Sequence, residues 1–309
     1  MKKIEELQGY LEERNFSQLF LLTDENTSKY CLPILLEKVD ILTDRQAVLL
    51  EIPAGEENKT LKTAKNLINS LAESDADRNS CLLSLGGGVV CDLGGFIASV
   101  YKRGIQNINL PTTLLSMADA AIGGKTALNH SGIKNLIGTF NFKTEVFIDT
   151  DFLSTLLYPQ IMDGAAEMLK TFLVFDWESA QEMMKTSDFT KINPFLIQHC
   201  AQIKENIVAQ DPYDTSVRKK LNFGHTLGHA AEMFYGLSHG HSVAIGMHYA
   251  IDLSVKHANY SPQKAKEIQN FLELHYTIPD YRKDMAQLIP LMRQDKKNSN
   301  GNINFVLLD

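Results

Sequence analysis

The first half of the chain alternates short apolar runs with segments long enough to form helices, and this alternation restricts the possible folds more than any other feature. The strand-like runs lie at residues 19–22, 47–52, 81–85, 108–115 and 146–149. The segments between them carry helical periodicity, as in the stretch 61–73. Strands separated by helix-length amphipathic segments predict βαβ units and a parallel sheet.

The periodicity changes to that of helices beyond about residue 156. Helical patterns occupy residues 161–175, 194–210, 225–234, 241–257 and 261–275. Only the stretch 303–308 resembles a strand. We therefore predict an α/β protein, with a Rossmann-like parallel-sheet domain over residues 1–157 followed by a mainly α-helical domain over residues 158–309.

Charge and composition exclude several classes of protein. The 309 residues carry a formal net charge of -7, whereas nucleic acids and anionic membranes attract basic surfaces. The chain has no apolar stretch long enough for a membrane span, and its N-terminus lacks the apolar core of a signal peptide. Four scattered cysteines, without a CxxC pair, are typical of reduced core residues. We expect a cytoplasmic enzyme without nucleic-acid or membrane partners.

A triple glycine, 86–88, ends the third predicted strand and opens a helix. Such a turn can hold a pyrophosphate on backbone N–H groups, although an isolated triple glycine is more often only a tight turn. Polar residues that follow neighbouring strands favour the first interpretation. These residues are Asp24, Glu56, Lys59, Asp92, Thr112 and Thr113. Together they predict a dinucleotide site at the carboxyl edge of the sheet.

A carboxylate and several histidines in the second half have the spacing of metal ligands. Glu167 and Lys170 are three residues apart, which places them on one helix face. His225 and His229 are four apart, and His239 follows ten residues later. Any one of these histidines alone would more often be a hydrogen-bonded or surface residue. Their clustering favours a Zn²⁺-type site made of one carboxylate and two or three imidazoles.

Several cations lie in the same segments as these candidates. They are Arg103, Lys125, Lys134, Lys170, Lys204 and Arg218. A cation in a binding site carries a desolvation cost unless an anion meets it. A substrate with both a phosphate and a carboxylate would meet them, whereas a solvated position is the default for any single lysine.

Four segments together resemble the 3-dehydroquinate synthase family. They are residues 84–105, 110–138, 163–170 and 218–230, in that order along the chain. The block 110–138 is the most specific, because the glycerol-dehydrogenase-like metal enzymes share the fold and the metal layout but lack it. The similarity runs from about residue 20 to residue 309.

The resemblance implies a role for each matching position. The residues implied to line NAD are Asp24, Glu56, Lys59, Gly87, Gly88, Val89, Asp92, Thr112, Thr113, Lys134, Phe152, Thr155 and Leu156. The implied ligands of Zn²⁺ or Co²⁺ are Glu167, His225 and His239. The substrate phosphate would meet Lys125, Asn135, His229, Lys296 or Lys297, and Arg103 of a neighbouring subunit. The carboxylate and ring oxygens would meet Lys204, Arg218, Asn222, Asp119 and Lys170.

The resemblance also implies an activity and an assembly. The expected reaction converts 3-deoxy-D-arabino-heptulosonate 7-phosphate to 3-dehydroquinate and phosphate, a step of the shikimate route to aromatic amino acids, with NAD regenerated in every turnover. A homodimer is expected from the role of Arg103. Three alternatives remain: a deoxy-inosose or valiolone cyclase, a non-catalytic relative, and an NAD-linked polyol dehydrogenase. The pair Arg218 and Asn222 favours a carboxylated substrate over the other cyclases.

One position departs from the family pattern beside an expected metal ligand. The family usually has His-Gly-Glu where this chain has His239, Gly240 and His241. His241 could be a spare ligand, a solvent-facing residue at a helix N-terminus, or a proton relay.

Overall fold

The computed structural model describes residues 2–293 and 302–309, and it divides into two compact units, Met1–Leu157 and Tyr158–Asp309. The strands are β1 (Lys2–Lys3), β2 (Leu19–Asp24), β3 (Val48–Ile52), β4 (Cys81–Gly86), β5 (Gln106–Pro111), β6 (Leu128–His130), β7 (Ile133–Ile137) and β8 (Glu145–Ile148). The helices of the first unit are α1 (Leu7–Arg14), α2 (Glu25–Tyr30), α3 (Leu32–Leu36), α4 (Ile41–Asp44), α5 (Leu61–Glu73) and α6 (Gly88–Val100). Those of the second unit are α7 (Tyr158–Phe175), α8 (Trp177–Met184), α9 (Pro194–Gln210), α10 (His225–Tyr235), α11 (His239–His257), α12 (Pro262–His275) and α13 (Met285–Arg293).

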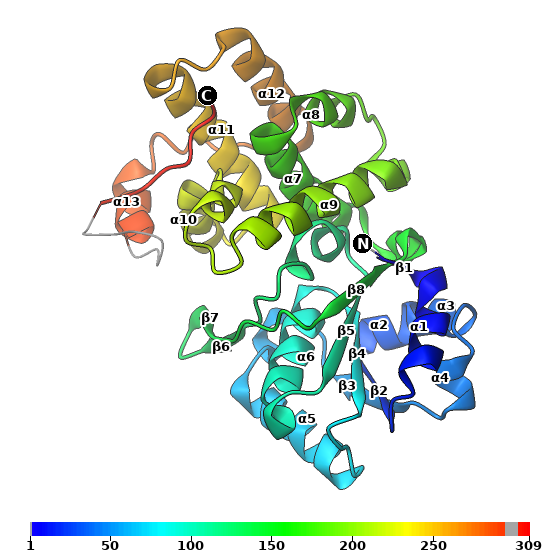
Figure 1. The fold of residues 1–309 in the computed structure, drawn as a ribbon. Helices are drawn as coiled ribbons and strands as arrows, with labels where there is room; N and C mark the ends of the chain where they lie inside the picture. Colours follow the sequence, from blue (N-terminus) through cyan, green and yellow to red (C-terminus); the bar gives the residue numbers. More distant parts are fainter. Residues whose placement is uncertain (1, 294–301) are drawn as a thin grey trace. The chain divides into compact units, whose positions relative to one another are not determined.

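A six-stranded sheet in the order β1-β8-β5-β4-β2-β3 forms the centre of the first unit. All of its paired strands are parallel, as predicted from the alternation of strand and helix. Figure 1 shows α5 and α6 on one side of this sheet and α1 to α4 on the other. The fold class is therefore confirmed.

Alternating side chains of the central strands build the core of the first unit. Phe20 and Leu22 of β2 lie in one buried cluster with Leu67 of α5 and Ile97 of α6. Because successive strand residues point to opposite faces, the intervening Leu21 is buried on the other side. A side chain cannot replace Gly94 of α6, since a Cβ there would lie 2.0 Å from Ser84 Oγ of β4. This glycine lets the helix lie directly on the sheet.

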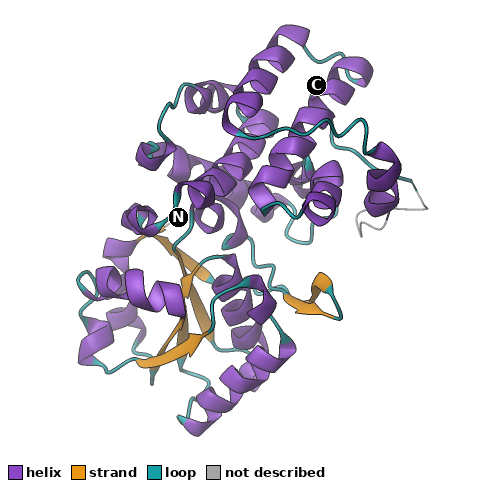
Figure 2. Cartoon of the chain, turned by 180° about the vertical axis from the view of Figure 1, so that it is seen from behind, coloured by secondary structure: helices purple, strands orange, loops and turns teal. Residues whose placement is uncertain are grey.

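Helices make up the regular structure of the second unit, and the part of it that the structure describes has no strand (Figure 2). Helices α10 and α11 pack against one another, and α11 also packs against α7. Among the described residues, no helix combines the length with the apolarity that crossing a bilayer requires.

Several local predictions differ from the structure. The run 108–115 was expected to be one strand, but β5 ends at Pro111 and a helical segment begins at Leu114. The stretch 303–308 was expected to be a strand, but its residues have no strand pairing. Ile303 and Phe305 instead pack against the cluster formed by α10, α11 and α13. The antiparallel hairpin of β6 and β7 was not expected, because most of its side chains are exposed and leave no apolar alternation in the sequence.

Candidate active site

The carboxyl ends of β2 and β4 form a switch point in the sheet. From β2 the chain continues to β3 on one side, whereas β4 leads to β5 on the other. Ligands of open α/β sheets bind outside the strand ends at such a point. Asp24 ends β2 and caps α2 by accepting the N–H of Thr27 at 2.8 Å, while Gly87 is the N-cap of α6. Both residues lie at the strand ends where the sequence predicts a dinucleotide.

Close packing requires glycine at only one of the three positions 86–88. A Cβ at Gly86 would lie 2.5 Å from the side chain of Val90, so the fold itself requires glycine there. A Cβ at Gly87 or Gly88 would meet its nearest neighbour at 3.2 or 3.4 Å, which is far less restrictive. Small residues at the start of a 13-residue helix leave the N–H groups of Gly88 and Val89 open to an anion. Their contact with NAD stays a prediction.

Lys59 joins residues from three elements of the first unit. Its Nζ lies 2.5 Å from Asp92 Oδ2 on α6, 2.7 Å from Asn135 Oδ1 on β7 and 3.9 Å from Glu56 Oε1. The hairpin is fixed here as well, because Asn129 Nδ2 donates to Glu56 Oε1 at 2.8 Å. Asn135 was predicted to meet the substrate phosphate, and the structure places it among the predicted NAD residues.

The other predicted residues of the first unit lie beyond the strands or on exposed turns. Thr112 is buried directly after β5, and the Thr113 N–H donates to Ser116 Oγ at 3.1 Å. Phe152, Thr155 and Leu156 follow β8, in and just after the 3-10 helix Thr150–Thr155. Asp119 lies in the short helical turn Ser116–Ala120. The predicted site cations Arg103, Lys125 and Lys134 of this unit are exposed.

Glu167, His225 and His239 converge in the second unit, from α7, α10 and α11. One ligand atom of each lies within 4.8 Å of the others. Glu167 Oε1 is 3.3 Å from His225 Nε2 and 3.0 Å from His239 Nε2. Metal-ligand bonds of about 2.0–2.1 Å in a tetrahedron separate neighbouring ligand atoms by roughly 3.3 Å. The spacing and the donor set, one carboxylate with two imidazoles, fit Zn²⁺ or Co²⁺.

Charge fixes the ionisation of this cluster. Burial alone would raise the pKa of Glu167, but Lys170, His225 and His239 outweigh it and hold that pKa well below its usual range. Burial lowers the pKa of His239, yet its contacts with Glu167 and Glu232 outweigh this effect and raise it to about 10. Lys170 Nζ donates to Glu167 Oε2, which leaves Oε1 facing the two histidines. The carboxylate is thus ionised and oriented before a metal binds.

Close helix contacts bring the ligands together. A Cβ at Gly240 of α11 would lie 2.3 Å from the backbone of Asp163 on α7. Asp163 Oδ1 accepts from Ser238 Oγ at 2.5 Å and from the His241 N–H at 3.2 Å, so it holds the first turn of α11. This anchoring fixes His239, the first residue of that helix, opposite Glu167.

A second group of predicted residues is cationic and buried. Lys170, Lys204 and Arg218 are each at most 6 % exposed, and Asn222 closes the 3-10 helix Val217–Asn222. Asp211 organises the loop before that helix by accepting N–H bonds from Ser216 at 2.7 Å and Arg218 at 3.0 Å. Burial would raise the pKa of Asp211, but the backbone N–H groups outweigh it and lower that pKa.

Sequence reasoning left three neighbours of the site unassigned: Asp163, Asp211 and Glu232. The spacing in the sequence could have indicated Glu232, which follows His225 by seven residues and His229 by three and so shares their helix face. The ring of His229 lies 5.2 Å from that of His225, centroid to centroid. Lys296 and Lys297 lie outside the described residues.

His241 lies away from the ligand atoms. Its Nε2 donates to the backbone carbonyl of Thr277 at 2.8 Å, and its ring lies 5.8 Å from that of Tyr276. Among the described residues, the metal-competent group comprises Glu167, His225 and His239 without His241.

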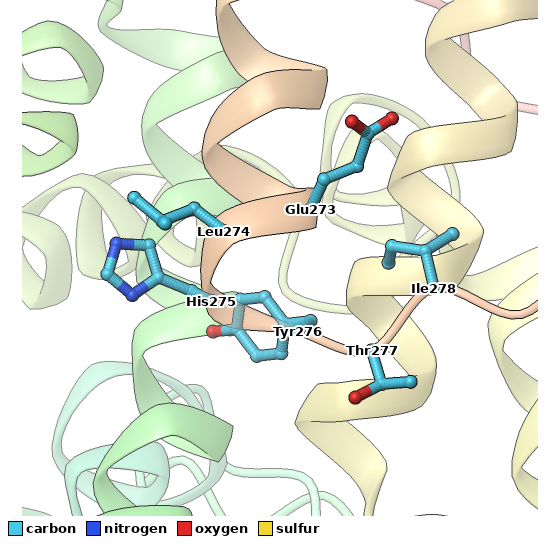
Figure 3. A pocket seen from close by; sticks show the side chains of 6 residues that line it. All are labelled: Glu273, Leu274, His275, Tyr276, Thr277 and Ile278. Atoms are coloured by element: carbon cyan, nitrogen blue, oxygen red, sulfur yellow. The ribbon is translucent and has the colours of Figure 1, made fainter.

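A cavity of about 400 Å³ lies at the end of α12, and its lining includes Thr277, whose carbonyl His241 contacts. Figure 3 shows the side chains that line it. Its lining residues are Glu273, Leu274, His275, Tyr276, Thr277 and Ile278. None of these is a predicted site residue.

Solved structures with this fold include two sugar-phosphate cyclases. A 2-deoxy-scyllo-inosose synthase complexed with carbaglucose-6-phosphate, NAD⁺ and Co²⁺ is 24% identical, with a TM-score of 0.83 over 97% of this chain and 84% of the other. The 2-epi-5-epi-valiolone synthase of Streptomyces hygroscopicus subsp. jinggangensis, with NAD⁺ and Zn²⁺ bound, is 23% identical, with a TM-score of 0.76 over 94% and 84%. Fold and cluster define the class: a Rossmann-like unit followed by a helical unit with a candidate divalent-metal site.

Sequence comparison identifies the family. The model of the 3-dehydroquinate synthase N-terminal domain matches residues 49–163, and that of the C-terminal domain matches residues 164–298. A 3-dehydroquinate synthase from Parabacteroides distasonis is 39% identical over 98% of this chain and 88% of its own length. The chain belongs to the 3-dehydroquinate synthase family.

Proposed function

We propose that the chain catalyses the 3-dehydroquinate synthase reaction, in which 3-deoxy-D-arabino-heptulosonate 7-phosphate becomes 3-dehydroquinate and phosphate. The observation that carries this proposal is the convergence of Glu167, His225 and His239, with Lys170 against the same carboxylate. Relatives named for this reaction, at 36–39% identity, support the choice of substrate.

Each group of residues would have a separate task. A divalent metal bound in the site would polarise neighbouring substrate hydroxyls and lower the barrier to their deprotonation. Glu167, His225 and His239 would hold that metal, and the buried Lys204 and Arg218 would receive the substrate carboxylate. Such cations gain most from an anionic ligand because burial has already removed their water.

The order of the chemistry follows from the substrate. Oxidation at C5 acidifies the neighbouring C–H, so phosphate can leave by elimination. Reduction at C5 and ring opening then allow an intramolecular aldol closure. The chain contributes by fixing the reacting atoms, since such positioning can supply up to roughly 7–11 kcal/mol of the barrier reduction. NAD is regenerated in this sequence and is a cofactor rather than a consumed substrate.

A homodimer belongs to this proposal through Arg103. Lys102, Arg103 and Gly104 have φ values of 47°, 68° and 119°, a backbone that non-glycine residues rarely adopt. Strained turns of this kind persist where the surrounding structure or a function requires them. The turn carries an exposed guanidinium, as a residue that serves a neighbouring subunit's phosphate site should.

We also place the enzyme in the cytoplasm. Its four cysteines are buried and free, which suits a reducing compartment. Burial raises the pKa of the Cys81 and Cys91 thiols, so these groups stay protonated and unreactive.

The test is to incubate the protein with NAD⁺, Co²⁺ and the heptulosonate phosphate while following phosphate release and NADH absorbance together. The proposal expects continuous phosphate release without net accumulation of NADH. Net NADH formation would instead indicate a polyol dehydrogenase, and absence of both signals a non-catalytic relative. A sugar phosphate without a carboxylate serves as the control substrate, and its faster turnover would indicate another cyclase.

A further inference from the structure

His239 lies between two carboxylates contributed by different helices. Its Nε2 is 3.0 Å from Glu167 Oε1 on α7, and its Nδ1 is 3.1 Å from Glu232 Oε2 on α10. The side chain of Glu232 is only 14% exposed, so its carboxylate is largely shielded from water. Both ring nitrogens therefore have fixed partners.

The tautomer of His239 follows from these contacts. A metal ligand must offer a lone pair, and the nitrogen that faces Glu167 is Nε2. The proton of the neutral ring must then be on Nδ1, where only an acceptor can meet it. Glu232 is that acceptor.

The other imidazole of the cluster is held in a different way. His225 directs Nε2 at the same Glu167 oxygen, but its Nδ1 lies 3.1 Å from the backbone carbonyl of Phe223. One ring is thus oriented by the main chain and the other by a side chain. Only the orientation of His239 depends on a residue that substitution can remove.

We propose that Glu232 is the positioning residue of the metal site, which holds His239 in the tautomer and ring orientation that ligate the metal. The proposal rests on the metal site of the proposed function and adds a residue to it. A charged acceptor on Nδ1 also increases the electron density at Nε2, which strengthens the metal bond. Helix α10 thus carries one ligand, His225, and also Glu232, the residue that orients the other ligand.

The experiment measures metal affinity in the absence of NAD and substrate. Purified metal-free protein is titrated with Co²⁺, and the visible absorption of bound Co²⁺ gives both its affinity and its coordination. Glu232→Ala should weaken binding by about 10- to 100-fold, which is typical for the loss of such an outer partner. Glu232→Gln keeps an acceptor oxygen without the charge and should recover part of that loss.

Glu273→Gln is the matched control, because Glu273 Oε1 lies 3.0 Å from His248 Nε2 in a His–Glu pair outside the cluster. This variant should bind Co²⁺ like the wild type. Wild-type affinity with an unchanged Co²⁺ spectrum in Glu232→Ala would overturn the proposal. If that variant does not fold, the same result in Glu232→Gln would do so. Metal binding without cyclase activity would contradict the proposed function and leave this inference intact.

Discussion

At the scale of single residues, Glu167 is the most constrained group of the metal cluster. It is 1 % exposed and contacts Lys170, His225 and His239. Its sequence spacing predicted the shared helix face with Lys170. Residue spacing alone did not show which two of the three histidines reach it, because that depends on how α10 and α11 pack. The family resemblance named His225 and His239, the two that converge on Glu167 in the structure.

Glu167→Gln should remove metal binding and also destabilise the protein by about 3–5 kcal/mol, since it leaves the buried ammonium of Lys170 without its carboxylate partner. Urea unfolding of the metal-free protein measures the second effect. The double variant Glu167→Gln/Lys170→Met should regain much of this stability and still bind no metal. Equal stability of wild type and Glu167→Gln would show that the ion pair does not hold the two helix residues together.

Asp211 gives a pH dependence of stability. Its pKa is lower in the folded protein than in the unfolded chain, so its contribution is present above the unfolded value of about 4 and declines as pH falls through the folded pKa. The wild type should therefore exceed Asp211→Asn in unfolding free energy at neutral pH. This difference should shrink below about pH 4, as measured by urea unfolding across pH. A difference that stayed constant down to acidic pH would contradict the role of the ionised carboxylate.

At the scale of elements, glycines determine how closely the ligand-bearing helices approach. A Cβ at Gly246 of α11 would lie 1.7 Å from the carbonyl oxygen of Gly224 and 2.7 Å from the nitrogen of Gly228 on α10. The sequence contains these glycines within helical patterns, where they count against a helix. Only the packed structure shows that these glycines allow the two helices to approach each other closely.

Gly246→Ala should therefore separate α10 from α11, at a cost of about 1–3 kcal/mol or more. Because His225 and His239 lie on these two helices, Co²⁺ affinity should fall as well. Gly9→Ala is the control: it adds the same methyl group in α1, where nothing lies within 4 Å, and should stabilise the helix by up to about 1 kcal/mol. Thermal unfolding and Co²⁺ titration of both variants check this, and equal behaviour would contradict it.

The predicted strands agree with the structure where burial of the side chains leaves an apolar pattern in the sequence. Strands β2, β3 and β4 coincide closely with the predicted runs because their side chains are buried on one or both faces. The hairpin of β6 and β7 escaped prediction since its side chains are mainly exposed. The prediction of a strand over residues 303–308 was wrong for the opposite reason. Apolar residues of this segment pack against a helical cluster, and this packing needs no strand partner.

At the scale of the whole molecule, the acidic chain keeps cations inside a mainly helical unit. The net charge is -7, yet Lys170, Lys204 and Arg218 are buried. Sequence spacing could nominate these residues one by one. Sequence spacing could not predict the contacts that support these residues, such as the hydrogen bonds from backbone N–H groups to Asp211 beside Arg218. These bonds join residues that come together only in the folded loop.

The central claim is that Glu167, His225 and His239 bind a divalent metal on which turnover depends. The most direct measurement is phosphate release from the heptulosonate phosphate, before and after treatment with a chelator, in the presence of NAD⁺. The account predicts that chelation abolishes phosphate release and that Zn²⁺ or Co²⁺ restores it in the wild type but not in Glu167→Gln. Undiminished turnover in protein shown to be free of metal would contradict it.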